Sequence, residues 1–367
     1  MIYSNFRRFL TAASVCLAMA YALAVGLTAS PALDVTSASA QTGGTVPGNF
    51  AGNVNDAELW RLVRKGVTGK VSIPDKKAGT LVQPQGDAML AFRNKAMSSF
   101  GGWIILISIV VMVAFFLIRG RVKIGAGFSG QTIERFNALE RATHWLTASS
   151  FIVLAISGLN LLYGKHFLPA MIGKSGFATV TEFGKLAHNY IGFAFIIGLV
   201  LMFVLWIKDN LWSRYDLDWI ATGGGLFVDG VHADSERFNF GQKAVFWMTI
   251  IFGGSLAFSG ICLLFPFEFA PFAPTFGFLK SLGFNLSSDI SPLYETQLAL
   301  AWHGLLSLLM IAAIILHIYI GSLGMEGAID AVASGQVDVN WAREHHNKWV
   351  ERLEAEGSGA AEQQPAE

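Results

Sequence analysis

The sequence predicts an all-α membrane protein, and its composition, its hydropathy and its apolar pattern all support this fold class. Of 367 residues, 53% are hydrophobic and only 14% are charged, whereas about a quarter of the residues of soluble domains are charged. The mean hydropathy is +0.49. Six apolar stretches approach the ~20 residues that a helix needs to cross a membrane: residues 9–29, 101–118, 145–163, 189–207, 244–265 and 297–320. Backbone groups in lipid must be paired within the segment, so we expect helices.

Charge and cysteine content exclude several classes. The 26 basic and 26 acidic residues balance, so the chain lacks the basic footprint of a nucleic-acid-binding protein. Cys16 and Cys262 both lie in apolar runs, which excludes a disulfide framework, a cysteine zinc site and an iron–sulfur cluster. A redox cofactor would therefore need other ligands, and the eight histidines are the candidates.

The first apolar stretch has the pattern of a secretory signal peptide. Arg7 and Arg8 precede it, and Ala38-Ser39-Ala40 resembles a cleavage site. We expect a signal peptide over 1–40. The apolar part is longer than the usual ~7–15 residues, so an uncleaved anchor is the alternative. Both readings place residue 41 outside the cytoplasm.

Residues 41–98 are predicted to form an extracytoplasmic arm. The segment is polar, with scattered Gly, Pro and Lys, and has too few apolar residues for its own core. A short amphipathic helix is expected at 55–65 and a loop at 71–77. We see no internal repeat with a period of 20–50 residues.

Alternation of the spans predicts the topology. An extra transmembrane helix at 99–120 is followed at once by Arg119, Arg121 and Lys123, which places this end in the cytoplasm by the positive-inside rule. The loop 164–187 is then outside and 208–243 inside. A core of four helices is expected over 121–330, with a cytoplasmic tail at 331–367.

Four histidines lie in or at the ends of the apolar spans: His144, His188, His303 and His317. Ionisable residues there are rare and indicate function, although any one of them alone is as well explained by a hydrogen bond to a neighbouring helix. His303 and His317 are 14 residues apart, which is within about 40° of four helical turns and about 21 Å along the axis. They therefore share a face, one near each side of the membrane.

Topology then pairs the four histidines. His188 begins a span outside and should meet His303, whereas His144 begins a span inside and should meet His317. Two bis-histidine sites stacked across the bilayer are what two b-type haems require. Zinc is set aside, because four histidines at two depths cannot form one tetrahedral site.

For other residues near these histidines, a functional and a structural explanation are both open. Gly158 and Gly260 are among the small residues where a flat macrocycle would lie, but close helix packing explains them equally. Arg141 and Lys185 could pair with haem propionates or mark topology. His345 and His346, in the polar tail, are expected to be solvated, and His166 lies in an outer loop. His232 either carries protons or has no role.

Several motifs together resemble the gamma subunit of respiratory formate dehydrogenase, a prokaryotic di-haem cytochrome b family, over about 131–350. They are Arg141-Ala142-Thr143-His144-Trp145, Lys185-Leu186-Ala187-His188, Phe238-Asn239-Phe240-Gly241-Gln242-Lys243, Phe246-Trp247, His303, His317-Ile318-Tyr319 and Trp341-Ala342-Arg343-Glu344-His345-His346.

This resemblance implies a four-helix transmembrane di-haem bundle, preceded here by the extra helix and the signal-like segment. It implies a bacterial inner-membrane subunit of anaerobic respiration that anchors the extracytoplasmic catalytic (alpha) and iron–sulfur (beta) subunits of formate dehydrogenase. Electrons from formate would pass through an outer haem b, held by His188 and His303, and an inner haem b, held by His144 and His317. Quinone would be reduced in a pocket lined by Asn239 and Gly241, with Gln242 adjacent. The chain itself carries no formate chemistry.

Two alternatives stay open. The chain could be the related cytochrome b subunit of a nickel–iron hydrogenase or a thiosulfate reductase. It could also be a haem-free membrane anchor or transporter with structural histidines. A transporter would more often carry carboxylates at mid-membrane, whereas Glu268 and Glu295 lie near span ends.

Overall fold

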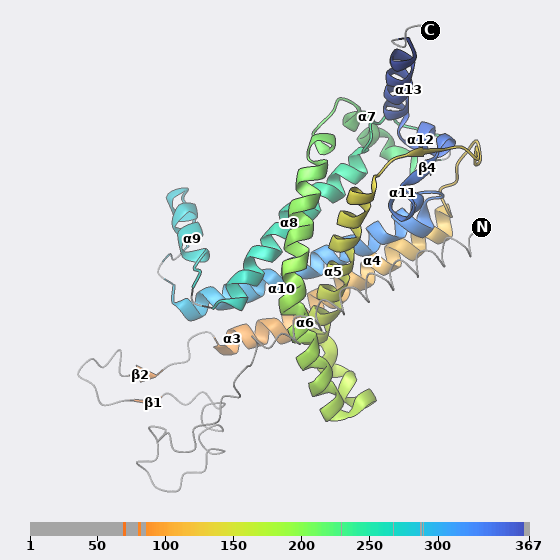
Figure 1. The fold of residues 1–367 in the computed structure, drawn as a ribbon. Helices are drawn as coiled ribbons and strands as arrows, with labels where there is room; N and C mark the ends of the chain where they lie inside the picture. The colour runs from red at the N-terminus through yellow and green to blue at the C-terminus, as the bar shows by residue number, and fades with distance from the viewer. Residues whose placement is uncertain are drawn as a thin grey trace, which may run out of the picture. The chain divides into compact units, whose positions relative to one another are not determined.

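In the computed structural model of the protein, residues 69–70, 80–81 and 86–362 are described, apart from 229, 267, 287 and 289 (Figure 1). They fall into two units that divide between residues 96 and 97. In the first unit, β1 (Gly69–Lys70) pairs antiparallel with β2 (Thr80–Leu81), and α3 spans Gly86–Ala91. The expected signal peptide and the elements expected at 55–65 and 71–77 lie outside the described residues.

The predicted all-α membrane fold is confirmed. Five helical segments of the described residues are long and apolar enough to cross a membrane. Their main helices are α4 (Ser98–Arg119), α5 (Ala138–Tyr163), α6 (Leu168–Trp206), α8 (Phe240–Leu264) and α10 (Pro292–Tyr319). Short turns of helix adjoin three of them: η3 (Phe92–Met97), η4 (Gly164–His166) and η7 (Ile320–Gly324). The stretch at 9–29 lies outside the described residues.

Helix α6 begins about twenty residues before the predicted span. The sequence predicted an outer loop at 164–187, but α6 is helical from Leu168, apart from a break at Gly173 where φ is +73°. Lys174, Glu182 and Lys185 lower the hydropathy of this part. Charged residues of this kind are good helix formers, so a hydropathy criterion missed an element that helix propensity allows.

Local capping fixes where three of the long helices start. Asn137 and Asn239 each cap a helix through a reciprocal capping box, with Glu140 and Gln242 respectively at the third helical position. Ser291 accepts a hydrogen bond from Tyr294 N and precedes a proline at the first position of α10. Such caps pair backbone N–H groups that a helix start would otherwise leave unsatisfied.

Helices α5 and α8 are an internal repeat with an offset of 102 residues. The run Glu134-Arg135-Phe136-Asn137 recurs as Glu236-Arg237-Phe238-Asn239, and the Ser-Gly pair at 157–158 recurs at 259–260. Their partners repeat more weakly, since His188 and Met202 on α6 are spaced as His303 and His317 are on α10. This offset is longer than the period of about 20–50 residues that is typical of repeat proteins.

The long helices contact one another in the pairs α5–α6, α8–α10, α4–α10 and α6–α8. Small residues permit the close approaches. A Cβ at Gly101 of α4 would lie 2.6 Å from the Tyr163 hydroxyl, and a Cβ at Gly198 of α6 would collide with Thr147 of α5. Backbone proximity through small residues is the usual way that membrane helices pack.

The chain after α10 folds back onto the starts of α5 and α8. Strand β3 (Thr132–Glu134) pairs antiparallel with β4 (Gln336–Asp338), with Ile133 opposite Val337. The remaining elements are η5 (Lys208–Asn210), α7 (Tyr215–Thr222), η6 (Gly223–Gly225), α9 (Phe272–Ser281), α11 (Asp330–Ala333), α12 (Val339–His345) and α13 (Asn347–Glu362). We call the end of the bundle that α7 and α11–α13 cover the tail end (Figure 1).

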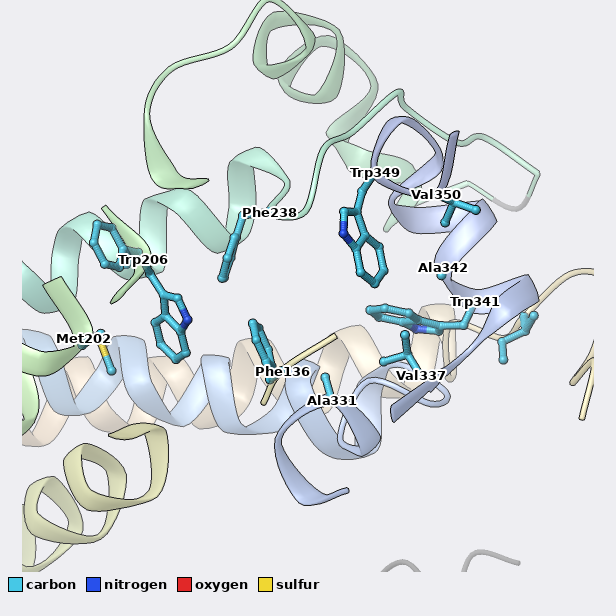
Figure 2. Packing of buried hydrophobic residues seen from close by; sticks show 12 residues of the cluster. Phe136, Met202, Trp206, Phe238, Ala331, Val337, Trp341, Ala342, Trp349 and Val350 are labelled. Atoms are coloured by element: carbon cyan, nitrogen blue, oxygen red, sulfur yellow. The ribbon is translucent and has the colours of Figure 1, made fainter. Parts of the chain in front are cut away.

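Part of the segment predicted as a cytoplasmic tail is therefore packed into the core. Figure 2 shows Trp341 and Trp349 from the tail beside Phe136 and Phe238, which precede α5 and α8. Trp341 is 2% exposed. Burial of these large apolar surfaces ties the tail to the bundle.

Candidate functional site

His188 on α6 and His303 on α10 face each other, as the sequence predicted. Their ring centres are 6.1 Å apart and the planes are inclined by 65°. An imidazole nitrogen binds a metal at about 2.0–2.1 Å and lies about 1.1 Å from its ring centre, so two imidazoles on opposite sides of one metal have ring centres about 6.3 Å apart. The observed separation therefore suits a single iron between the two rings.

A serine holds each of these rings by its Nδ1 atom. Ser157 Oγ lies 2.9 Å from His188 Nδ1, and Ser259 Oγ lies 3.0 Å from His303 Nδ1. Each hydroxyl also donates to a carbonyl of its own helix, at Val153 and Leu256. The hydroxyl must then accept from Nδ1–H, which leaves the Nε2 lone pair of both histidines available to a metal.

The two halves of this pair are related by the internal repeat. Ser157-Gly158 on α5 adjoins His188, and Ser259-Gly260 on α8 adjoins His303. A Cβ at either glycine would lie 3.5 Å from the Cε1 atom of the neighbouring histidine. The glycines thus leave one edge of each ring uncovered. Two helices carry the histidines, and two repeated helices orient their rings.

The second predicted pair consists of His144 on α5 and His317 on α10. The two side chains are close enough to interact electrostatically. Within the described part of the chain, His144 Nδ1 is buried and has no hydrogen-bond partner. The Trp145 ring lies edge-on to His144, with centres 5.3 Å apart, and its Nε1 donates to Val332 O at 2.9 Å. In the other half of the repeat, the positions equivalent to His144 and His317 hold Phe246 and Met202. This second histidine pair is therefore not repeated.

The three residues predicted to line a quinone pocket lie together at the start of α8. Asn239 and Gln242 form its capping box, with Asn239 Oδ1 accepting from Gln242 N at 3.0 Å. Gly241 lies under Trp219 of α7, where a Cβ would be 2.9 Å from the indole ring. All three thus have a structural role in addition to any contact with a ligand.

Arg135 and Arg237, the two repeated arginines, cross-link the starts of α5 and α8. Arg135 Nη2 donates to Arg237 O at 2.6 Å, and Arg237 Nη2 donates to Arg135 O at 2.5 Å. Arg237 also pairs with Glu140 at 2.7 Å and with Asp209 at 2.7 Å. Arg135 instead donates to Gln242 Oε1 at 3.1 Å. Within the described residues, the partly exposed Arg237 thus has carboxylate partners and the buried Arg135 has none.

The residues Arg135, Trp341, His345 and His346 form a buried group that sequence reasoning missed. His345 and His346 were expected to be solvated, but His346 is fully buried and His345 is mostly covered, because α12 lies against the starts of α5 and α8. The Arg135 guanidinium carbon lies 5.0 to 5.8 Å from the ring centres of four aromatic side chains: Phe136, Phe238, Trp341 and Trp349. The Glu-Arg-Phe-Asn repeat was the sequence signal that could have drawn attention to Arg135.

Charged residues outside the predicted set also stabilise this end. Lys243 and Asp216 form an ion pair at 2.9 Å, with side chains only 5% and 3% exposed, and it ties α7 to α8. Arg141, considered for a propionate, donates to Phe136 O at 3.2 Å. Lys185 donates to Asn189 Oδ1 at 2.5 Å.

No group of three or more His, Cys, Asp and Glu side chains converges within the residues that the structure describes. Each histidine pair therefore offers two protein ligands. A metal bound there would need its other ligands from elsewhere, as a macrocycle supplies them.

Comparison with known proteins gives consistent matches to this core. Residues 135–334 match the family described as prokaryotic cytochrome b561. The chain is 31% identical over 223 residues to the formate dehydrogenase cytochrome b556(fdo) subunit of Escherichia coli K12, covering 60% of this chain and 93% of that protein. It is 26% identical over 226 residues to the nitrate-inducible cytochrome b556(Fdn) subunit of the same organism, covering 60% and 92%. The formate dehydrogenase cytochrome b556 subunit of Haemophilus influenzae is 21% identical over 219 residues, covering 59% and 82%.

Proposed function

The chain belongs to the prokaryotic cytochrome b561 family, and from this premise we propose that it is the membrane-anchoring cytochrome b subunit of a formate dehydrogenase. In this role it receives electrons from an extracytoplasmic iron–sulfur subunit and delivers them to quinone near the cytoplasmic side. Membership of the family implies haem b as the cofactor.

The observation that carries the proposal is the opposed pair of His188 and His303. The 6.1 Å between ring centres and the serine-bound Nδ1 atoms suit axial ligation through both Nε2 atoms. Haem b held by these two imidazoles would supply one-electron transfer. Ser157 and Ser259 hold the rings in the required tautomer and orientation.

We assign His144 and His317 to a second, inner haem b. Support comes from their proximity, from the unpaired Nδ1 of His144 and from the position of His317 14 residues beyond His303 on the uninterrupted helix α10. The two pairs are thus separated by about 21 Å along the helix axis.

The quinone pocket is proposed at the start of α8, with Asn239, Gly241 and Gln242 as its lining. The side-chain amide N–H groups of Asn239 and Gln242 can donate to a quinone oxygen, because their oxygen atoms already serve the capping box. Reduction of quinone to quinol takes two electrons and two protons. A pocket at the tail end takes the protons from the cytoplasm if Arg119, Arg121 and Lys123 mark the cytoplasmic side.

The remaining parts of the proposal concern placement and partners. The protein is a multi-pass protein of the bacterial inner membrane with a cytoplasmic C-terminus, and residues 41–98 face the outside. There they contact the catalytic (alpha) and iron–sulfur (beta) subunits of formate dehydrogenase. The relatives are named as formate dehydrogenase subunits, which supports an association of this kind.

Haem quantification tests the assignment. The full chain, solubilised in detergent, should contain about two b haems per polypeptide by pyridine haemochrome. His188→Ala or His303→Ala should each remove one haem, and His144→Ala or His317→Ala should each remove the other. His166→Ala is the matched control, since His166 is exposed in η4, and it should leave both in place.

Further results would decide between the alternatives. Well-folded protein without haem would overturn the assignment and favour an anchor or transporter. Haem in membranes that hydrogen reduces, or that thiosulfate reoxidises, and that formate does not reduce would favour the related hydrogenase or thiosulfate reductase subunit. Haem reduced by formate and reoxidised by added quinone supports the whole proposal.

A further inference from the structure

Four buried polar side chains at the tail end have no part in the proposed electron path. We call Arg135, Trp341, His345 and His346 the tail cluster. The Arg135 guanidinium carbon lies 5.0 Å from the Trp341 ring centre. The Trp341 ring centre in turn lies 5.4 Å from that of His345 and 5.2 Å from that of His346. Arg135, His345 and His346 thus all lie beside the Trp341 ring.

Five polar atoms of the tail cluster are buried without a hydrogen-bond partner in the described part of the chain: Arg135 Nε and Nη1, Trp341 Nε1, His345 Nε2 and His346 Nε2. One unpaired buried polar group costs about 1–3 kcal/mol, so five would cancel much of the ~5–15 kcal/mol that stabilises a typical fold. Native proteins satisfy such groups with ordered water. The tail cluster therefore has the chemistry of a hydrated site.

Donors and acceptors in the cluster favour water over an anion. Arg135 and Trp341 can only donate. His346 Nδ1 lies 2.7 Å from Glu236 O, and a carbonyl only accepts, so Nδ1 carries the proton and Nε2 is an acceptor. An anion would pair with Arg135 and Trp341 but would leave His346 Nε2 unpaired, whereas water both donates and accepts.

The cluster extends from the protein surface to the proposed quinone pocket. The exposed ring of His232 has its centre 6.2 Å from that of His345. At the opposite side, Arg135 Nη2 donates to Gln242 Oε1 at 3.1 Å, and the same oxygen accepts from Asn239 N at 3.2 Å. One hydrogen bond therefore joins the cluster to the cap that holds the pocket residues.

Burial, more than the charges around the cluster, keeps its histidines neutral. His345 is faced by Glu344, His232 and Arg135, and His346 by Arg135 and His345. Arg237 and Glu140 face Arg135. Burial, the largest influence, lowers the pKa of His345 to about 4 and that of His346 well below its usual value. Both rings thus have a free lone pair at neutral pH and release a proton readily once they have taken it.

We propose that the tail cluster, with its bound water, is the proton-uptake site of this protein, leading protons from His232 at the surface through His345 and His346 to the water held by Arg135 and on to quinone at Gln242. The inference rests on the proposed function, because the consumer of the protons is quinone. Each quinone takes two electrons from the haem side and two protons through the cluster to become quinol.

Stopped-flow oxidation of the haem tests this inference separately from the proposed function. The haem-loaded full chain is reduced with stoichiometric dithionite and mixed with menadione or ubiquinone-1 between pH 6 and 9. Haem absorbance follows electron transfer, and an indicator dye in weak buffer follows proton uptake. His346→Gln and His345→Gln are compared with the wild type and with the exposed control His166→Gln.

Both variants should keep the haem content and spectrum of the wild type. Their haem should be oxidised at least roughly tenfold more slowly at pH 8, because proton transfer by a positioned group contributes factors of this size and above. The oxidation rates of both variants should fall almost tenfold for each unit by which the pH rises. This dependence is expected when protons come directly from solvent, because the rate then follows the proton concentration. In His345→Ala, added imidazole should restore the rate, which a merely structural defect would not allow.

Wild-type rates in both glutamine variants at every pH would overturn the inference and leave the proposed function standing. If His346→Gln fails to bind haem, the less buried His345→Gln and the exposed His232→Gln decide by the same criteria. Wild-type haem that no quinone oxidises would instead overturn the proposed function, and this inference with it.

Discussion

Arg135 and Arg237 each donate a hydrogen bond to the backbone carbonyl of the other, at 2.6 and 2.5 Å. The two residues occupy equivalent positions of the internal repeat, so the contact is reciprocal, like a contact across a two-fold axis. It joins the starts of α5 and α8, the two helices that carry Ser157 and Ser259. The repeat breaks at the partner residue, which is Glu140 for Arg237 and Gln242 for Arg135.

Removing the carboxylate of Glu140 should destabilise the fold strongly. Glu140 is 5% exposed, and both of its carboxylate oxygens accept from Arg237 Nη2, at 2.7 and 2.9 Å. Breaking a buried pair typically costs about 3–5 kcal/mol, and because Asp209 remains bonded to Arg237 we expect Glu140→Gln to lower the free energy of unfolding by about 3 kcal/mol. Denaturant titration in detergent, followed by helical circular dichroism, measures it.

The exposed pair of Arg343 and Glu354, with both side chains 58% exposed, provides the control for that variant. Glu354→Gln should change the free energy of unfolding by less than about 1 kcal/mol. An equal effect of the two variants would show that the buried pair contributes no more than a surface pair.

Ser157→Ala and Ser259→Ala should each raise the midpoint potential of the outer haem. Without the serine oxygen, Nδ1–H loses its side-chain acceptor and keeps only the backbone carbonyl of Leu154 or Leu256. The imidazole is then a weaker donor and the oxidised iron is less stabilised. Loss of such a partner typically weakens metal affinity about 10–100-fold, so faster haem loss should accompany the shift. Potentiometric titration of the visible spectrum measures it.

Ser149→Ala is the matched control for the two serine variants. Ser149 lies on α5 as Ser157 does, and its hydroxyl donates only to Leu146 O, at 3.4 Å. The Ser149→Ala variant should have the haem midpoint potential and the haem content of the wild type. Unchanged potentials in Ser157→Ala and Ser259→Ala would argue against axial ligation by His188 and His303.

Acid should destabilise the fold through the tail cluster. Burial lowers the pKa of His345 to about 4 in the folded protein, against 6.5 in the unfolded chain, so below pH 6.5 the unfolded chain binds more protons. This contribution to stability is complete above pH 6.5 and is lost as the pH falls towards 4, at up to about 1.4 kcal/mol per pH unit. Unfolding titrations at several pH values should show a shallower loss in His345→Gln. An identical slope in the wild type and His345→Gln, with His166→Gln as reference, would contradict the prediction.

Gly241→Ala should disturb the contact between α7 and α8. A Cβ at Gly241 would lie 2.9 and 3.0 Å from atoms of the Trp219 ring, and overpacking of this kind typically costs about 1–3 kcal/mol. We expect that loss of stability together with slower oxidation of the haem by quinone, at unchanged haem content. Gly254→Ala on the same helix is the control, since a Cβ there meets nothing within 4 Å, and it should behave as the wild type.

Local sequence features predicted much of the membrane core. Five of the apolar runs predicted the long helices of the described residues, and the spacing of His303 and His317 placed both on one face of α10. The pairing of His188 with His303 followed from alternating topology and is what the structure has. These features are encoded within stretches of about twenty residues, because hydropathy and helical periodicity depend only on neighbours along the chain.

The extension of α6 and the tail cluster could not be predicted in this way. Lys174, Glu182 and Lys185 reduce hydropathy without preventing a helix, so the start of α6 was placed too late. His345 and His346 lie in a polar segment and read as solvated, yet they are covered by residues that precede α5 and α8, more than a hundred positions earlier in the chain.

The helices, their caps and the spacing of the four histidines were thus encoded locally in the amino-acid order. The meeting of Arg135 with Arg237, the serine bonds to His188 and His303 and the burial of His346 arise only when α5, α6, α8, α10 and the tail are assembled. The physical reason is that a helix satisfies its own backbone within one segment, whereas a buried guanidinium or imidazole must find partners that the fold brings from distant segments.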